Sequence, residues 1–169
     1  VMARFENTGA VAKPLAEELG LVGPAARASG CARDVRRDFP TGAYQGMTIT
    51  PALGEDGDVL ARAQVRWQEI QQSVALVRTL ATTLPPGPCH EPCGALQPEA
   101  TVVSLQEGWR GEIAHMATTD SAGHFARYKV VDPSFHNWLG LAMALRNQQI
   151  SDFPLCNKSF NLSYCGHDL

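Results

Sequence analysis

The last eighteen residues of the chain contain the residue types best suited to metal or redox chemistry. They include the acid Asp152, two thiols, Cys156 and Cys165, and one imidazole, His167. Thiolate and imidazole groups bind zinc and other transition metals. The first question is therefore whether these side chains hold a metal ion.

A second pair of thiols, Cys89 and Cys93, lies in a proline-rich segment near the middle of the chain. Zinc takes four such ligands, and the tail thiols with His167 would complete the set. Two cysteines separated by three residues form a weak zinc pattern, and the two halves of the set are far apart in sequence. The other interpretation is a loop whose thiols bind nothing, and we favour it over a zinc-binding module.

A third group of chemically active residues surrounds Arg110. This arginine lies between Gly108 and Gly111, with Glu107 before them and Glu112 after them. Glycine lets the backbone approach other segments closely, while the guanidinium projects from the turn. The arginine either points into a cavity or forms an ion pair with a glutamate at the surface, and the spacing leaves both interpretations open.

Composition excludes several classes of function. The 169 residues are 44% hydrophobic and 18% charged, with a net charge of −3, and we expect residues 1–169 to form one domain. Without a basic stripe, the chain has no electrostatic reason to bind nucleic acid. Its apolar runs fall short of the roughly 18 residues that a membrane span needs. Five cysteines without a secretory signal indicate a reducing compartment.

The elements that must position these residues follow from the apolar pattern. Residues 14–19 predict a short helix, and residues 23–46 predict an irregular polar loop. A long helix is predicted from its N-cap Asp58 to Leu84, about 40 Å at 1.5 Å per residue. Its apolar stripe consists of Leu60, Ala63, Trp67, Ile70, Val74, Val77 and Leu84. Such a helix needs packing partners, and we expect some of them to lie outside this chain.

The second half of the chain predicts β-structure. Residues 101–105 form an expected strand, and residues 112–118 and 124–131 form an expected hairpin. Asp132 then caps a helix that extends to Arg146. The predicted fold class is α+β, with a long-helix bundle portion and a small antiparallel sheet.

Several of these motifs follow one another in a fixed order. They are Gly23–Gly30, Asp34–Arg36, Gly57-Asp58 heading a helix with Arg66, Glu69, Gln72 and Ser73, Pro85–Gly87, Glu107–Glu112, Pro133–Phe135 and Asp152. In this order they resemble the C-terminal part of the NiFe-hydrogenase large-subunit superfamily, over roughly residues 5–169. The superfamily includes large subunits of energy-converting hydrogenases and formate hydrogenlyase, and the hydrogenase-like large subunit of complex I.

The resemblance implies a helical bundle packed on a small β region, with a cavity facing an iron–sulfur small subunit. Hydrogenases hold a nickel–iron centre there with two pairs of cysteines, whereas complex I uses the metal-free cavity for quinone. The first cysteine pair belongs to the N-terminal half of the subunit, which we expect this chain to lack. The implied partners are that half, the small subunit with its 4Fe-4S cluster, and membrane subunits.

The family's second cysteine pair lies in a D-P-C-x-x-C motif. Counted from Asp152, its cysteines would fall at Pro154 and Asn157, whereas the thiols of this chain are Cys156 and Cys165. A bridging pair must hold both metals with thiolates about one helical turn apart, so a shifted register removes the site. We therefore expect no nickel–iron centre and no other cofactor in this chain.

The resemblance also carries over individual site residues. Arg110 matches the arginine above the hydrogenase metal site, Glu107 the acid before it, and Asp152 the aspartate that heads the second cysteine motif. We predict that these three line one cavity, where a cation can position a proton donor or a quinone oxygen. Arg27 and Asp34 are expected to shape the adjoining loop.

The predicted function is that of a large-subunit fragment, inactive alone, in an NADH:quinone oxidoreductase or a formate hydrogenlyase-type complex. NAD and quinone would act at the level of this complex, on the cytoplasmic, peripheral face of the inner membrane. One alternative is an active NiFe-hydrogenase subunit that uses Cys156 or Cys165 in another register. The other is a non-enzymatic assembly or zinc-binding module.

Overall fold

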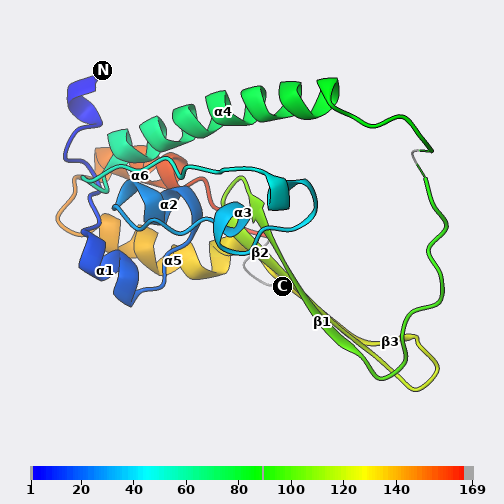
Figure 1. Cartoon of the computed structure of the whole chain (residues 1–169). Coiled ribbons are helices and arrows are strands. Elements are labelled where there is room, and N and C mark those ends of the chain that lie inside the picture. The colour runs from blue at the N-terminus through cyan, green and yellow to red at the C-terminus, as the bar shows by residue number, and fades with distance from the viewer. Residues whose placement is uncertain (1, 89, 166–169) are drawn as a thin grey trace.

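The computed structural model describes residues 2–88 and 90–165. The helices are α1 (Lys13–Glu18), α2 (Gly23–Ala28), α3 (Val35–Asp38), α4 (Val59–Thr82), α5 (Pro133–Ala144) and α6 (Phe153–Phe160), with 3₁₀ turns η1 (Met2–Arg4), η2 (Gly42–Gly46) and η3 (Ile150–Asp152). The strands are β1 (Thr101–Gly108), β2 (Gly111–Thr119) and β3 (Phe125–Val131). Figure 1 shows the short helices gathered at one end, with α4 running across them and the sheet projecting away.

The predicted α+β class is confirmed. The three strands form one antiparallel sheet in the order β1-β2-β3, so each strand pairs with the next along the chain. Leu105 of β1 pairs with Ala114 of β2, which pairs with Val131 of β3. The carboxylate of Asp132 then accepts a hydrogen bond from Ser134 N at 2.8 Å and starts α5 as predicted.

Helix α4 begins at the predicted cap but is packed over its first half alone. Asp58 accepts hydrogen bonds from Ala61 N and from Asn7 N, each at 2.7 Å. The buried residues of α4 all lie between Val59 and Val65. Beyond them the helix extends past the body of the protein, as Figure 1 shows. Among the described residues, no helix combines the length and the apolar character needed to span a membrane.

The prediction of an irregular loop over residues 23–46 is wrong. This segment contains α2, α3 and η2. Pro24 in the first turn of α2 favours a helix start, and the Asp34 carboxylate caps α3 by accepting from Arg36 N at 3.0 Å. These helices have six and four residues, too few for an apolar period to show.

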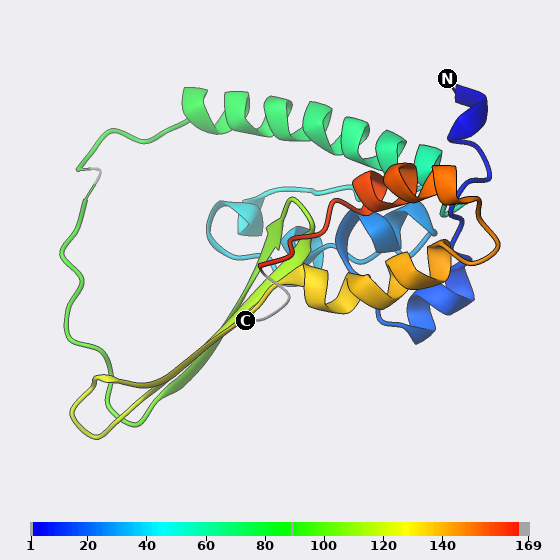
Figure 2. The ribbon, with the colours of Figure 1, turned by 180° about the vertical axis from the view of Figure 1, so that it is seen from behind.

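The hydrophobic core lies between α2 and the helices around it. Every residue of α2 is buried. The core residues include Val11, Ala16, Leu21, Ala25, Ala26, Val59, Leu141, Ala144, Cys156, Phe160 and Leu162. Figure 2 shows α6 beside the first half of α4 and next to α5. Residues 153–160 of the C-terminal tail thus form a helix that closes the core.

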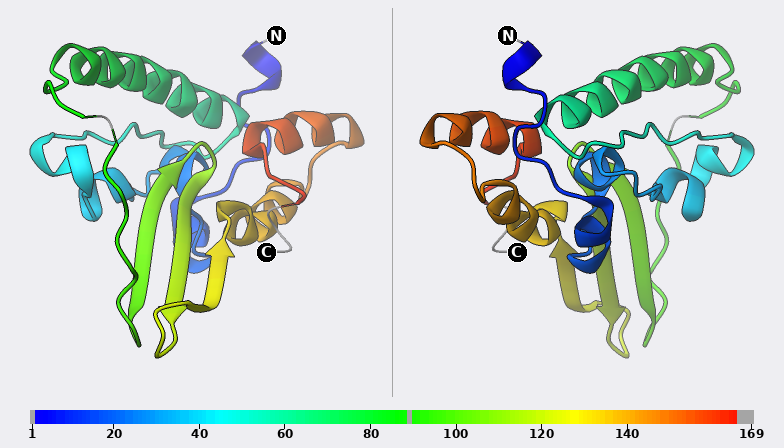
Figure 3. Two further views of the ribbon diagram at one scale, coloured as in Figure 1. Left: turned by 90° about the vertical axis from the view of Figure 1, so that its right-hand side faces the viewer. Right: turned by 90° about the vertical axis from the view of Figure 1, so that its left-hand side faces the viewer.

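Two glycines join α2 to the turn between β1 and β2. Gly23 and Gly111 have φ angles of +65° and +135°, which side chains rarely allow. A Cβ atom at Gly23 would lie 2.3 Å from the Cα of Gly111. The close backbone approach predicted around Arg110 is therefore present, and it brings the turn between β1 and β2 against α2, as the two views of Figure 3 show.

Candidate functional site

The side chain of Arg27, from α2, is the centre of a buried ion network. Its Nε donates to Glu69 of α4 at 2.6 Å, and its Nη2 donates to Glu107 of β1 at 2.8 Å. Its Nη1 donates to the carbonyl of Arg33 at 2.8 Å. Arg27 has no exposed surface, and a buried charge is stable only with such partners. One guanidinium thus joins α2, α4 and β1.

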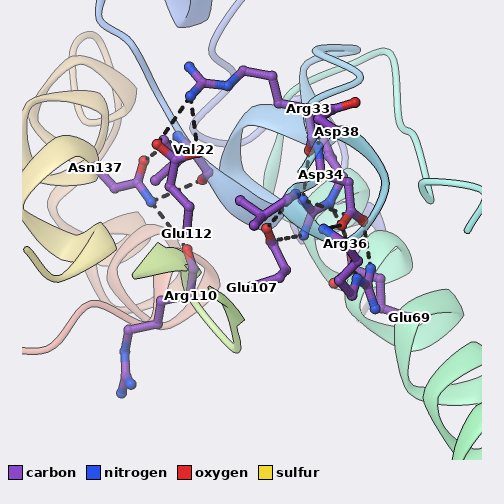
Figure 4. A network of polar contacts seen from close by, with 12 residues as sticks. Val22, Arg33, Asp34, Arg36, Asp38, Glu69, Glu107, Arg110, Glu112 and Asn137 are labelled. Atoms are coloured by element: carbon purple, nitrogen blue, oxygen red, sulfur yellow. Dashed lines mark hydrogen bonds and ion pairs between the residues drawn. The ribbon is translucent and has the colours of Figure 1, made fainter. Parts of the chain in front are cut away.

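A second ion pair continues the network at the start of α3. Arg36 donates to the Asp34 carboxylate through Nε at 2.9 Å and through Nη2 at 2.6 Å. The same carboxylate lies 4.0 Å from Nη1 of Arg27. Glu107 also accepts from Val35 N at 3.3 Å. Figure 4 shows Asp34, Arg36 and Glu107 gathered in this network.

The surroundings shift the pKa values of Glu107 and Asp34 in opposite directions. Burial raises the pKa of Glu107, and the neighbouring Arg27 offsets part of that rise. Burial also acts on Asp34, but the hydrogen bonds and charge of Arg36 outweigh it and lower the pKa of Asp34. Glu107 therefore takes up a proton more readily than a free glutamate, whereas Asp34 keeps its charge.

An open pocket of about 370 Å³ lies beside this network. Its lining residues are Arg36, Tyr44, Glu69, Ile70, Ser73, Val74, Glu107, Gly108 and Trp109. Arg36, Glu69 and Glu107 belong to the ion network, so one wall of the pocket is charged. Ile70 and Val74 of α4 add apolar surface. Such a combination suits a ligand with an apolar body and a few polar atoms.

Two polar groups at this wall keep unused hydrogen-bonding capacity. Arg36 donates to Asp34 through Nε and Nη2, and Glu69 accepts through Oε1 from Arg27. Within the described part of the chain, neither Nη1 of Arg36 nor Oε2 of Glu69 makes a hydrogen bond. The pocket can therefore offer one donor and one acceptor to a ligand.

A different set of arginines holds the end of α6. Arg66 of α4 donates to the carbonyls of Ser159 and Phe160, the latter at 3.0 Å. Arg110 donates through Nε to the carbonyl of Asn161. Cations at a helix C-terminus satisfy its free carbonyls and complement its dipole. Burial lowers the pKa of Arg66 to about 10.

Arg62 extends this set into the core. It donates to the hydroxyl of Ser159 at 2.8 Å and to the carbonyls of Gly57 and Gly9 at 2.6 and 2.9 Å. Its guanidinium also lies over the ring of Phe160, 4.3 Å from the ring centroid. Burial lowers the pKa of Arg62 to about 10. These contacts fix α6 to α4 and to the N-terminal segment.

The predicted site residues occupy three separate places. Glu107 lies in the ion network with Arg27, one of the two residues predicted to shape the adjoining loop. Figure 4 shows the Arg110 side chain pointing away from that network, toward the end of α6. Asp152 lies in η3, where it accepts from Arg4 at 3.3 Å and from Gln149 N at 3.2 Å. Neither Arg110 nor Asp152 lines the pocket.

Cys156 does not fit the part of a metal ligand. It is fully buried in α6, and a Cβ atom at Gly9 would lie 2.5 Å from its Sγ. Burial raises the pKa of this thiol, which opposes the thiolate that a metal needs. On the side of Gly9, the packing leaves no space beside Sγ even for a methyl group.

The other candidate ligands are dispersed. Cys93 and Cys165 are exposed, and Cys89 and His167 lie outside the described residues. Over residues 2–88 and 90–165, no three side chains of His, Cys, Asp or Glu are arranged to hold a metal ion.

Sequence reasoning missed the pocket-lining roles of Glu69 and Arg36. Glu69 is the single acidic residue in the sequence of α4, whose other charged residues are all arginines, and this lone carboxylate was the one sign of a buried partner. That partner, Arg27, is 42 residues away in sequence. Only the packing of α2 against α4 brings them together.

Comparisons with known proteins add three findings. A family model described as "Respiratory-chain NADH dehydrogenase, 49 Kd subunit" matches residues 1–93. Carbon monoxide-induced hydrogenase of Rhodospirillum rubrum is 34% identical over 161 residues, which cover 95% of this chain and 45% of that protein. NADH-quinone oxidoreductase subunit 4 of Thermus thermophilus is 30% identical over 176 residues, with coverage of 88% and 43%.

A solved structure shares the whole fold. It is described as "the membrane-bound sulfane sulfur reductase (MBS), an archaeal respiratory membrane complex". One of its chains matches 99% of this chain with a TM-score of 0.90 and 26% identity, over 47% of its own length. The chain therefore spans about half the length of these relatives.

Proposed function

Since the chain belongs to the family of the respiratory-chain NADH dehydrogenase 49 kDa subunit, we propose that it works within a membrane-associated oxidoreductase complex. The names of its relatives, a hydrogenase and an NADH-quinone oxidoreductase subunit, support an electron-transfer reaction. NADH:quinone oxidoreduction and formate hydrogenlyase-type chemistry are the two proposed forms of that reaction.

The proposed role of this chain is to hold a proton beside the pocket. The observation that carries this role is the contact of the Arg27 guanidinium with both Glu69 and Glu107 at the pocket wall. Glu107, whose pKa is raised by burial, can accept and release a proton there, while Arg27 stays charged. Arg36 and Glu69 would orient a polar ligand.

The electrons would come from outside this chain. We assign them to a 4Fe-4S cluster in a small partner subunit, with NAD and quinone acting elsewhere in the complex. Membrane subunits are further proposed partners, and the cytoplasmic face of the inner membrane is the proposed location. The structural relative belongs to a respiratory membrane complex, which supports the proposal of membrane partners. On its own, the chain is expected to transfer no electrons.

The test is Glu107→Gln in the intact complex. Because general acid–base groups contribute on the order of 100-fold or more to rate, turnover should fall by about that factor. The matched control is Glu112→Gln on the next strand, because Glu112 pairs with exposed Arg33 at 3.0 Å and does not line the pocket. Equal turnover in the two variants, with both complexes intact, would contradict the proposed role.

A further inference from the structure

The side chain of Asn137, on α5, connects two backbone segments that lie next to the ion network. Its Oδ1 accepts from Val22 N at 3.0 Å, and its Nδ2 donates to the carbonyls of Val22 and Arg110 at 3.1 and 3.4 Å. Asn137 is 1% exposed, so water does not compete for these hydrogen bonds. Figure 4 shows the side chain reaching Val22 beside the turn that carries Arg110.

Each of these two segments leads to one member of the central ion pair. Val22 directly precedes α2, which carries Arg27. Arg110 lies in the turn between β1 and β2, and Glu107 lies in the last part of β1. Since Arg27 and Glu107 meet at 2.8 Å, their contact requires α2 and the turn to keep one relative position. Asn137 bonds to both segments and therefore fixes that position.

Helix α5 is also packed closely on the residues that precede α2. A Cβ atom at Gly140, about one helical turn after Asn137, would lie 2.7 Å from Cδ2 of Leu21. The neighbouring Leu141 packs in the same core cluster as Leu21. The position of α5 is thus tied to the start of α2, and Asn137 extends this tie to the turn.

Other contacts between α2 and the turn are less directional or more exposed. Gly23 and Gly111 permit the close approach of the two backbones because neither has a side chain. The ion pair of Arg33 with Glu112 also spans the gap, but the Arg33 side chain is 57% exposed, and exposed pairs contribute little to stability. The buried amide of Asn137 supplies hydrogen bonds whose geometry defines the register.

We propose that Asn137 is a positioning residue of the pocket wall: it holds the turn after β1 against α2 and thereby keeps Glu107 on Arg27. Asn137 does not line the pocket, so it acts through the backbone of Val22 and Arg110 and not on a ligand. A displacement of α5 would accordingly move Glu107 out of the ion network. The inference rests on the proposed proton role of Glu107 for its effect on turnover.

Hydrogen exchange at the Val35 amide tests the position of Glu107, because Val35 N donates to Oε2 of Glu107 at 3.3 Å. The next amide, Arg36 N, donates to Asp34 and serves as the internal reference. Exchange is measured by NMR in the 169-residue chain. In Asn137→Ala, exchange at Val35 relative to Arg36 should be about tenfold faster, as expected for loss of a hydrogen bond to a charged group.

The matched control is Leu141→Ala, which removes core packing from the same helix. The Leu141 side chain cannot form hydrogen bonds to Val22 or Arg110, so this variant should leave the exchange ratio unchanged while it lowers the unfolding temperature. An unchanged ratio in Asn137→Ala, or an equal rise in Leu141→Ala, would overturn the proposal. If Asn137→Ala does not fold, Asn137→Ser takes its place, because a serine hydroxyl is too short to bridge both segments.

Turnover of the intact complex separates this inference from the proposed function. Asn137→Ala should lower turnover, and its combination with Glu107→Gln should lower turnover no further than Glu107→Gln alone. An additional loss in the double variant would overturn the claim that Asn137 acts through Glu107. If Glu107→Gln leaves turnover unchanged, the proposed function fails, whereas the exchange experiment still decides whether Asn137 positions Glu107.

Discussion

Arginines are buried in two regions of this molecule, and their partners differ in kind. Arg27 is surrounded by carboxylates, which outweigh its burial and raise its pKa. Arg62 and Arg66 face carbonyl and hydroxyl oxygens instead, and burial lowers the pKa of each to about 10. The Arg27 region contains groups that can exchange a proton, whereas the Arg62 region serves to fix one segment to another. Burial of the same residue type thus serves two purposes.

The largest expected effect on stability is at Arg27. Arg27→Met leaves Glu69 and Glu107 buried without their cation, and breaking a buried pair from one side costs about 3–5 kcal/mol. Urea unfolding of the 169-residue chain measures the loss. Arg27→Lys, which keeps the charge without the planar fork, should lose less. A loss below about 1 kcal/mol for Arg27→Met would show that the network is not a single unit.

Arg62→Met should lower the free energy of unfolding by about 2–3 kcal/mol, which is less than the loss expected for Arg27→Met. The substitution leaves the carbonyls of Gly9 and Gly57 without a donor, but it also removes a cation whose burial is unfavourable. The same urea unfolding experiment compares the two variants. Equal losses at Arg27 and Arg62 would break the distinction between the two regions.

The glycine contact that positions Glu107 should be sensitive to a single methyl group. Gly111→Ala would place a Cβ 2.9 Å from the backbone nitrogen of Gly23, at a φ of +135°. Strain of this kind costs about 1–2 kcal/mol. Gly46→Ala is the control, because no atom lies within 4 Å of its Cβ position. If both variants unfold at the same urea concentration, the contact does not hold β1 against α2.

The smallest effect is a difference in pH dependence. Because the pKa of Asp34 is lowered, its stabilisation is complete above the unfolded value of about 3.9 and is lost as pH falls through the folded value. Because the pKa of Glu107 is raised, stability is instead lost as pH rises from about 4.3 through the folded value. Asp34→Asn should reduce the loss of stability at low pH. Glu107→Gln should reduce the loss of stability that occurs as pH rises above about 4.3. Unfolding curves at several pH values would contradict this if both variants changed the profile in the same direction.

The sequence predicted the long elements well, because their patterns extend over several turns. The caps Asp58 and Asp132, the long helix and the hairpin were all predicted. Helix α2 has six residues, all of them buried, so it lacks the contrast between apolar and polar faces by which a helix is recognised. Its neighbour α3 is shorter still.

The site could be predicted only in part. Arg27, Asp34 and Glu107 were named from the sequence, but the pairing of Arg27 with Glu107 spans 80 residues and depends on the tertiary packing. Arg110 and Asp152 were predicted to join them. Their contacts are instead with Asn161 and Arg4, at other places in the fold. Residue type alone does not reveal which of several carboxylates an arginine will meet.

The central claim is that Glu107 holds a proton beside the pocket, under the influence of Arg27. Its most direct test is an NMR titration of the Glu107 side-chain carboxyl carbon in the isolated chain. The expected pKa lies above the ordinary value of about 4.3, and it should rise further in Arg27→Met, where the offsetting cation is lost. A pKa at or below the ordinary value in the unsubstituted chain would contradict the claim.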